Sequence, residues 1–430
     1  MADDAALSGG LVLSGQCWDG DGAPAYWPWV QVLRAGIEAG GNAGAAARLL
    51  PEDPVEGPAA GLPPAEDRFR LFDAVASFLA RLAHQRHVVV VLDDVHWADE
   101  GSLRLLEFAA HHLTAHPVLL LAVYRDEEAG PLLRRLAAVR EQVHLTALPQ
   151  AEVMALMAAV TGTSPPQHVA ENVWRRTGGN PFLVRELTRL LVAQGSYTEA
   201  SVPVPVLLAS VRDILERRLA RLSQRCVDLL TVAAVTGPEV RLHVLARTVD
   251  EPASVPVLVD EAVAARVLHE PPAPADAYRF SHDLFRETIL AGMAADQRIG
   301  LHLTVGRALE SLAAEGAVVH PAELAAHFGA AVTAAPSDAV RYGMLAGEQA
   351  ISRLAFEEAR AHYERVLSAL DLIADGSADQ RLDVLLRLGA TRNQAGDAPA
   401  ARSAYRDAAE LARAAGDATS LARAALGVHA

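Results

Sequence analysis

Short apolar runs alternate with amphipathic segments over the first 150 residues of the chain. Residues 88–92 (VVVVL) and 118–123 (VLLLAV) have the length and composition of strands that are buried on both faces of a parallel sheet. Residues 67–84 carry apolar side chains at helical spacing and predict an amphipathic helix. Because strands alternate with helices, this part predicts a doubly wound parallel sheet. The other elements expected here are strands over 11–16 and 143–146, a loop over 17–29, a loop with a weak helix over 41–66, and helices over about 99–112 and 131–139.

After Leu148-Pro149 the pattern becomes helical as far as about residue 290. The sequence GGNP at 178–181 interrupts it once, and Pro203 and Pro205 interrupt it again, which indicates a domain boundary at the second position. Residues 266–281 predict a β-hairpin with a proline-rich turn. Beyond about residue 295 the pattern predicts helices alone.

Two segments near the C-terminus resemble each other at an offset of 42 residues, since ARAHY at 359–363 recurs as ARSAY at 401–405. Gly-Asp pairs at 396–397 and 416–417 flank the second copy. This pattern predicts helix–turn–helix repeats of the tetratricopeptide kind, with a period longer than the usual ~34 residues. An irregular helical bundle is the alternative that two copies leave open.

Composition narrows the possible functions. The chain has a formal net charge of −15, which disfavours binding of nucleic acid by the surface as a whole. All 38 basic residues are arginines, so a mechanism that needs a lysine is closed to this chain acting alone. Two cysteines far apart in sequence form no disulfide framework or zinc motif and predict a reducing, cytoplasmic setting. The acidic N-terminus is unlike a signal peptide, and no apolar run is long enough to predict a membrane span.

The strongest chemical signal is VVVVLDDVHWAD at 88–99. An apolar strand that ends in Asp93 and Asp94 supplies what a magnesium–nucleotide site needs, because one carboxylate can hold hydrated Mg²⁺ and its neighbour can polarise water. Open α/β sheets also bind their ligands at the carboxyl ends of the strands. A buried strand that simply ends in an acidic turn is the alternative for the Asp pair alone.

The longer string, Asp93 to Asp99, resembles the Walker B motif of STAND-type signalling ATPases in large LuxR-family regulators. Further segments resemble that family in the same order: the loop after its second strand, its sensor strand, its lid motif and the end of its winged-helix domain. In this chain these are residues 15–29, 122–127 (AVYRDE), 178–183 (GGNPFL) and 280–287 (FSHDLFRE). The resemblance covers nearly the whole chain.

The resemblance implies a role for each matching residue. Asp93 would hold Mg²⁺, Asp94 would be the general base, and Arg125 would sense the γ-phosphate of ATP. Pro181 would lie against the nucleotide as the lid closes, and His282 would contact the β-phosphate of ADP. Simpler explanations are a surface ion pair for Arg125, a helix start for Pro181, and a core position for His282.

The family's phosphate-binding loop, G-x-x-x-x-G-K-[ST], does not occur in the sequence. The loop would supply backbone N–H groups, a helix dipole and a lysine. We therefore expect weak or absent ATP binding and no turnover by this chain alone. The resemblance also places the family's first strand between the segments that match 118–123 and 143–146. Without that strand we expect either direct pairing of these two segments or an open, aggregation-prone edge.

The expected fold class is an incomplete α/β parallel-sheet ATPase core followed by a helical lid, a winged helix and helical repeats, mostly helical overall. The expected domain bounds are 1–149, 150–203, 204–292 and 293–430. The resemblance implies ATP or ADP with Mg²⁺ as cofactors, a protein partner or small-molecule inducer at the repeats, and possible self-assembly. DNA would be bound only through a domain outside this chain, and no membrane is expected. The chain is expected to be a truncated signalling ATPase, and a degenerate pseudo-ATPase is the second expectation. The alternative functions are a nucleotide-independent scaffold or the regulatory part of a cyclase- or kinase-linked protein.

Overall fold

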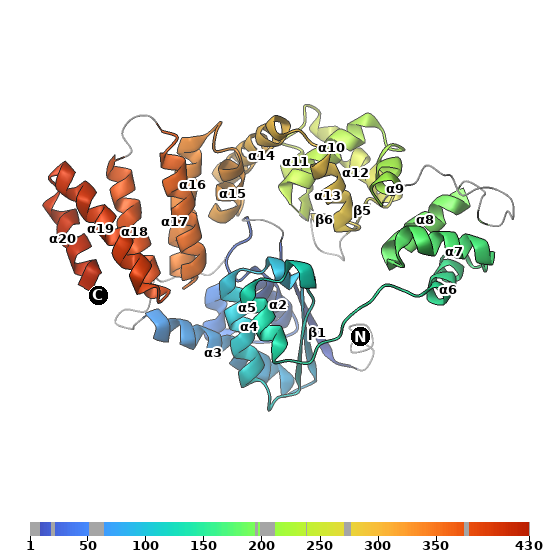
Figure 1. Ribbon diagram of the computed structural model, residues 1–430, viewed down its shortest axis with the longest axis horizontal. Helices are drawn as coiled ribbons and strands as arrows, with labels where there is room; N and C mark the ends of the chain where they lie inside the picture. Colours follow the sequence, from blue (N-terminus) through green and yellow to red (C-terminus); the bar gives the residue numbers. More distant parts are fainter. Residues whose placement is uncertain are drawn as a thin grey trace. The chain divides into compact units, whose positions relative to one another are not determined.

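The computed structural model describes residues 9–18, 22–50, 64–193, 197, 211–237, 239–270, 277–373 and 378–429. The chain divides into two compact units. Residues 1–140 and 295–430 form the first, here called the core–repeat unit, and residues 141–294 form the second, here called the middle unit. The predicted fold class, a parallel-sheet core with helical regions that dominate the chain, is confirmed (Figure 1).

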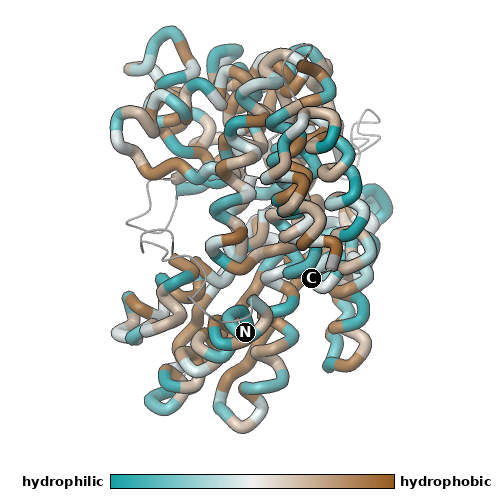
Figure 2. The backbone as a smooth tube through the Cα atoms, turned by 90° about the vertical axis from the view of Figure 1, so that its left-hand side faces the viewer, coloured by the Kyte–Doolittle hydropathy of each residue, from teal (hydrophilic) through white to brown (hydrophobic). Residues whose placement is uncertain are grey.

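A three-stranded parallel sheet lies in the N-terminal part of the core–repeat unit. The strands β1 (Leu11–Gln16), β2 (Val88–Asp93) and β3 (Val118–Ala122) follow the order β1-β2-β3, and all three were predicted. They are among the apolar stretches of backbone in Figure 2. The helices that pack around them are α2 (Trp27–Glu38), α3 (Pro64–Ala83), α4 (Glu100–His112) and α5 (Pro131–Ala138), with 3₁₀ turns η1 (Gly44–Leu49), η2 (Val95–Trp97) and η3 (Asp126–Glu128).

The predicted loop over 17–29 is wrong at its end, because α2 already begins at Trp27. Pro28 lies in the first turn, where its missing N–H breaks no helical hydrogen bond. Trp29 is completely buried and its indole N–H donates to the carbonyl oxygen of Ser102 at 3.1 Å. The aromatic segment therefore helps to build the core. In 41–66, η1 is the weak helix that was expected, and residues 51–63 lie outside the described residues.

The predicted strand over 143–146 is wrong. These residues are irregular, and Val143 and Leu145 are 81% and 90% exposed. Among the described residues β3 pairs only with β2, so direct pairing of the two segments is excluded there. Leu119 of β3 is 46% exposed, as expected of an apolar strand with an open edge. A short apolar alternation forms a strand only where a partner strand accepts its hydrogen bonds.

The middle unit contains a three-helix cluster and a small mixed region. Helices α6 (Gln150–Thr161), α7 (Gln167–Thr177) and α8 (Pro181–Ala193) pack around an apolar core that includes Val153, Met157 and Leu187. The second region has an antiparallel sheet in the order β4-β6-β5. Its elements are α9 (Val211–Leu219), α10 (Gln224–Thr236), β4 (Glu239–Arg241), α11 (Leu242–Leu245), η4 (Pro252–Ser254), α12 (Val255–Ala264), β5 (Leu268–His269), β6 (Ala277–Phe280) and α13 (Asp283–Ala291).

The predicted hairpin over 266–281 is confirmed, because β5 pairs with β6 in antiparallel register. Its proline-rich turn, residues 271–276, lies outside the described residues, as does the predicted break at Pro203 and Pro205. Strand β4 was not predicted, since three residues carry too little pattern to identify.

The C-terminal part is helical throughout its described residues, as predicted, and each helix packs on the next. Its helices are α14 (Ala295–Ala314), α15 (Pro321–Ala330), α16 (Pro336–Ser352), α17 (Phe356–Leu370), α18 (Ala378–Gln394), α19 (Ala398–Ala415) and α20 (Ala418–His429). No helix in the described ranges has both the length and the apolar character required to cross a bilayer.

The 42-residue repeat has a structural basis in two glycine–tyrosine contacts. A Cβ built on Gly347 of α16 would lie 2.5 Å from the ring of Tyr363 in α17, and one built on Gly389 of α18 would lie 2.8 Å from the ring of Tyr405 in α19. Both pairs therefore use the absence of a side chain to bring two helices together. The helix pairs α16–α17 and α18–α19 are equivalent repeats.

We expect Gly347→Ala and Gly389→Ala each to destabilise the repeats by about 1–3 kcal/mol, because the added methyl group meets a buried ring. Gly300→Ala is the matched control: it lies in α14 with open space around its Cα, so the higher helix propensity of alanine should stabilise by up to about 1 kcal/mol. Thermal unfolding of the three variants checks this. Equal shifts for all three would contradict the packing argument.

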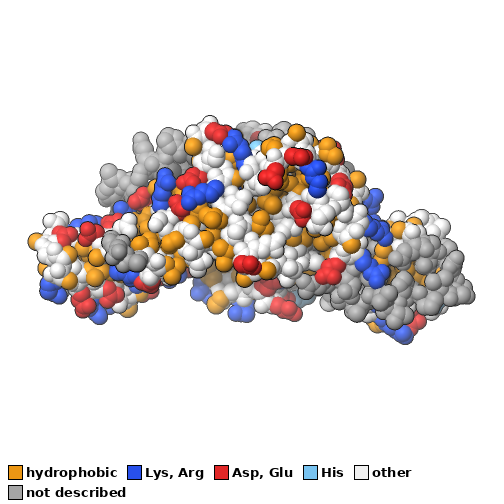
Figure 3. Space-filling model, turned by 90° about the horizontal axis from the view of Figure 1, so that it is seen from above, with side chains coloured by type: hydrophobic (Ala, Val, Ile, Leu, Met, Phe, Trp, Pro, Cys, Tyr) orange, Lys and Arg blue, Asp and Glu red, His pale blue; other side chains and the backbone are white. Residues whose placement is uncertain are grey.

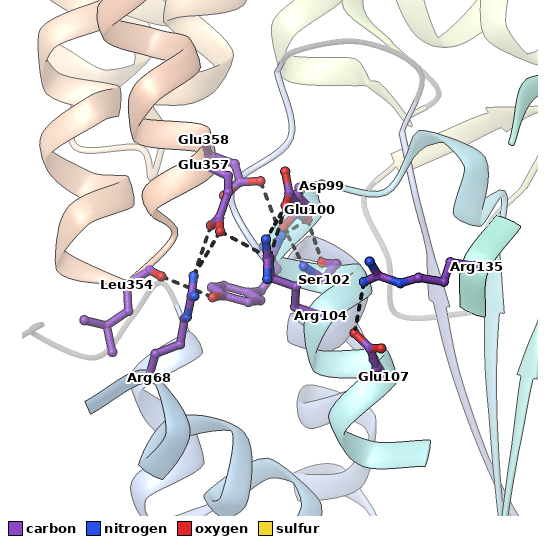
Figure 4. Close-up of polar contacts among 12 residues, drawn as sticks. Arg68, Asp99, Glu100, Ser102, Arg104, Glu107, Arg135, Leu354, Glu357 and Glu358 are labelled. Atoms are coloured by element: carbon purple, nitrogen blue, oxygen red, sulfur yellow. Dashed lines mark hydrogen bonds and ion pairs between the residues drawn. The ribbon is translucent and has the colours of Figure 1, made fainter. Parts of the chain in front are cut away.

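The sheet and the repeats are joined within the core–repeat unit (Figure 4). Glu357 at the start of α17 accepts from Arg68 of α3 at 3.1 Å and lies 3.2 Å from the Nε of Arg104 in α4. The hydroxyl of Tyr26 donates to the carbonyl oxygen of Leu354 at 3.4 Å. This contact brings the N-terminus of α4, which follows β2 closely, against the first repeat.

Candidate functional site

Asp93 and Asp94 lie at the carboxyl end of the parallel sheet. Asp93 is the last residue of β2, and its neighbour in β1 is Gln16. Asp94 has φ 53°, a left-handed conformation that aspartate tolerates better than most residues, and η2 follows it directly. The amide of Gln16 donates to Asp94 at 3.3 Å, and the N–H of Asp94 donates to the carboxylate of Asp93 at 3.0 Å. The turn therefore holds two carboxylates side by side at the strand tip.

The electrostatic field at this tip is negative. Partial burial, and then the charge of Asp94, raise the pKa of Asp93. Burial also raises the pKa of the Cys17 thiol, and the charges of Asp99, Asp94 and Asp93 raise it further. Because these acids disfavour a further negative charge, the strand tip favours a bound cation.

Arg125 lies one strand further along the same sheet edge. Val123 donates its N–H to Leu92 at 2.8 Å and accepts from Val95 at 2.9 Å, which fixes the end of β3 beside the tip of β2. Arg125 donates to Glu128 at 2.9 Å, and its guanidinium lies 5.4 Å from the centroid of the Trp97 ring. The expected surface ion pair of Arg125 is present, with Glu128 as a partner.

Pro181 and His282 come together in the middle unit. Pro181 begins α8, as the simpler explanation expected, and His282 caps α13 by accepting from the N–H of Leu284 at 3.2 Å. The rings of Phe182 and His282 stack at 3.9 Å. A cavity of about 570 Å³ is lined by Pro181, Phe182 and His282 together with arginines that include Arg185 and Arg266. Asp93, Asp94 and Arg125 belong to the core–repeat unit.

The residues at the strand tip fit a hydrated Mg²⁺ ion. Such an ion is usually bound by one or two carboxylates and keeps several water or phosphate oxygens, and Asp93 is exposed enough to provide one ligand. Within the described residues there is no cluster of three or more His, Cys, Asp or Glu side chains that could hold a metal unaided. A metal here would therefore depend on oxygens from its substrate or from water.

The same residues do not fit a triphosphate. Its charge needs a nest of backbone N–H groups and a cation, and the chain contains no lysine and no phosphate-binding motif. Arg125 is the cation beside the acidic pair in the described part of the sheet edge, and Glu128 already binds it. No hydrolytic step follows from these residues alone.

Sequence analysis missed three residues that shape the strand tip. The side chain of His96 is fully buried and its Nδ1 accepts from the N–H of Arg125 at 3.4 Å. Gln16 binds Asp94, and Asp99 caps α4 by accepting from Ser102 while it also accepts from the N–H of Tyr26. The contact of Asp99 with Tyr26 spans 73 residues and leaves no local pattern.

One protein of known sequence resembles most of this chain. A protein of Rhizobium meliloti (strain 1021), itself described as uncharacterized, is 27% identical over 359 residues, which are 79% of this chain and 34% of that protein. The chain thus spans about a third of the length of this relative.

Three solved structures resemble the chain at low TM-scores. A STAND protein with a tetratricopeptide repeat sensor from Pyrococcus horikoshii covers 97% of this chain and 76% of its own, with 11% identity and a TM-score of 0.38. The match to a Walker-type ATPase of Pyrococcus abyssi covers 50% of this chain and 67% of that protein, with 13% identity and a TM-score of 0.24. The match to RuvB of Thermotoga maritima covers 66% of this chain and 90% of that protein, with 16% identity and a TM-score of 0.25.

Residues 2–121 match the AAA ATPase domain. The match spans β1, β2 and nearly all of β3, and it includes the strand that ends in Asp93 and Asp94. The matched residues thus contain the parallel sheet and its acidic strand tip, and this part of the chain is similar to the AAA ATPase domain.

Proposed function

We propose that this chain is part of an ATP-dependent signalling ATPase of the STAND type, as in large LuxR-family regulators, and that on its own it does not hydrolyse ATP. The observation that carries the proposal is the pair Asp93 and Asp94 at the tip of β2 in an AAA ATPase domain. In this proposal Asp93 holds Mg²⁺, Asp94 is the general base and Arg125 senses the γ-phosphate. Among the described residues no strand pairs with the outer edge of β3, where the family's first strand would pair.

Two residues of the middle unit have a proposed role in nucleotide sensing, Pro181 against the nucleotide and His282 at the β-phosphate of ADP. Pro181 and His282 share one cavity, and His282 stacks on Phe182, the residue after Pro181. We propose that α6 to α8 act as the lid and that α9 to α13 with their antiparallel sheet act as the winged helix. Nucleotide exchange would then change how these parts and the core interact.

We propose that the helical repeats receive a protein partner or an inducer, or drive self-assembly, in a cytoplasmic setting. Basic and acidic side chains are interspersed on the face drawn in Figure 3. That pattern fits a protein or small-molecule partner better than a nucleic-acid backbone. Binding of DNA would belong to a domain outside this chain.

The first test is nucleotide binding by the 430-residue chain with Mg²⁺. One positive charge about 4 Å from a phosphate is worth about 4 kcal/mol at an effective dielectric near 20, or roughly a thousandfold in affinity. The chain lacks that lysine, so radiolabelled ATP should not bind in the micromolar range. Micromolar binding would overturn this part of the proposal.

A longer version of the chain, extended at its N-terminus, tests the roles of Asp93 and Asp94. The DNA just upstream of Met1 is searched for an in-frame strand and phosphate-binding loop, and the chain is expressed with that segment. We expect it to bind and hydrolyse ATP. Asp94→Asn should keep binding and lower turnover by at least about a hundredfold, and Asp93→Asn should remove the Mg²⁺ dependence of binding. Wild-type turnover by Asp94→Asn would contradict the assignment.

A nucleotide-independent scaffold is the second candidate, and the absence of any lysine from the chain favours it. The two candidates differ in one outcome. If no phosphate-binding loop is encoded upstream and no nucleotide binds, the acidic pair is a remnant and the contact between sheet and repeats is the functional feature.

A further inference from the structure

A cavity of about 310 Å³ lies between the end of the parallel sheet and the helical repeats, inside the core–repeat unit. The sheet side of its wall comes from the segments after β1 and β2, including Trp18, Trp27 and Asp99. The repeat side comes from α15, α16 and α17 and the short link between the last two. A volume of this size is at the lower end of the range for small-ligand pockets, ~300–1,000 Å³.

Part of the wall is flat and apolar. The rings of Trp18 and Trp27 lie 5.4 Å apart and are tilted by 57°. Several alanines line the same cavity, among them Ala346 and Ala350 of α16. Two indole rings and small apolar side chains in one wall suit an aromatic or apolar group.

The other part of the wall is rich in cations. Arg353, Arg360 and Arg365 all line the cavity from the repeat side. The neutral form of His362, also in the wall, is favoured because burial lowers its pKa to about 3.

Three of the acidic residues in the wall already have donors. Glu357 binds Arg68 and Arg104, and Glu100 binds Arg104 as well. Asp99 accepts from Ser102 at 2.6 Å and from the N–H of Tyr26 at 3.2 Å.

Two donors in this wall have no acceptor. The indole N–H of Trp27, a residue only 8% exposed, and the Nε of Arg360 are both buried without a hydrogen-bond partner. Oε2 of Glu358 is also buried without one, and burial with nearby acids raises the pKa of Glu358, which favours its protonated form. An unpaired buried donor is destabilising, and a ligand with two acceptor oxygens can satisfy such donors.

We propose that this cavity binds a small aromatic carboxylate, whose carboxylate accepts from Arg360 and from the Trp27 indole while its ring lies against Trp18 and Trp27. The ligand touches sheet and repeats at once. It therefore stabilises their contact and couples its own concentration to the docking of the repeats. The binding does not depend on the proposed nucleotide chemistry.

The test is titration calorimetry on the whole 430-residue chain with three probes. Phenylacetate has both the charge and the ring, phenylacetamide keeps the ring without the charge, and acetate keeps the charge without the ring. We expect phenylacetate to bind below about 1 mM and both others to bind at least about tenfold more weakly. Equal affinity for phenylacetate and phenylacetamide, or no binding of phenylacetate, would overturn the proposal.

Variants locate the site. Arg360→Met should weaken phenylacetate binding about tenfold or more, and Trp27→Phe, which keeps a ring but removes the N–H, should weaken it by about two- to tenfold. Arg402→Met is the matched control, because Arg402 is an exposed arginine of α19 outside the cavity. Unchanged phenylacetate binding in both cavity variants would contradict the assignment of this cavity as the binding site. If either variant unfolds, as judged by circular dichroism, the comparison of the three probes on the wild-type chain decides.

Discussion

Glu357→Ala is expected to separate the helical repeats from the sheet and to lower stability by about 3 kcal/mol. The Glu357 side chain is 7% exposed and binds Arg68, whose own side chain is 16% exposed. Removal of the carboxylate leaves a largely buried guanidinium without its anion, and the penalty for that unpaired charge exceeds the net value of the intact pair. Urea unfolding followed by tryptophan fluorescence measures the loss, because Trp27 and Trp97 lie close to this contact.

Two further variants separate this effect from a general effect of charge. Glu348→Ala removes the exposed partner of Arg387 in the repeats and should cost less than about 1 kcal/mol. Replacing both Arg68 and Glu357 by leucine should cost less than Glu357→Ala alone, because no charge is then left unpaired. A loss for Glu357→Ala no larger than that for Glu348→Ala would show that the repeats are not held by this pair.

Features that are local in sequence were predicted well. The run VVVVL is β2, Asp93 and Asp94 stand at its end, and α4 begins at Glu100, within one residue of the start expected for that helix. Each of these depends on neighbouring residues only. A buried parallel strand needs an uninterrupted apolar run, and a helix cap needs a short polar side chain at one position.

Features that depend on distant residues were missed. The apolar residues at 143–146 did predict a strand, but Val143 and Leu145 have no partner strand and remain exposed. The contact between Arg68 and Glu357 joins positions 289 residues apart, and neither residue carries a motif. The glycine–tyrosine pairs illustrate an intermediate case. Sequence analysis found the 42-residue offset from Tyr363 and Tyr405, but only their packing identified the glycines as part of the repeat.

The stability of the core–repeat unit should fall as the pH rises from about 5 to about 8, and Glu358→Gln should remove much of that fall. Burial, followed by the charges of Asp99 and Glu357, raises the pKa of Glu358 from its usual 4.5 to about 8. The N–H of Gly101 donates to it at 3.5 Å, which offsets the burial only slightly. In this window the folded chain holds a proton that the unfolded chain releases, so each step up in pH favours unfolding.

Glutamine mimics the protonated carboxyl, since its oxygen can still accept from Gly101 and its amide can donate towards Asp99. At pH 8 we therefore expect Glu358→Gln to be more stable than wild type by up to about 4 kcal/mol, while at pH 5 the two should be nearly equal. Urea unfolding at both pH values measures this, with Glu410→Gln on α19 as the control that should leave the pH dependence unchanged. If wild type is equally stable at pH 5 and pH 8, the Glu358 carboxyl ionises freely, and the contact between sheet and repeats is more open to water than the burial of Glu358 implies.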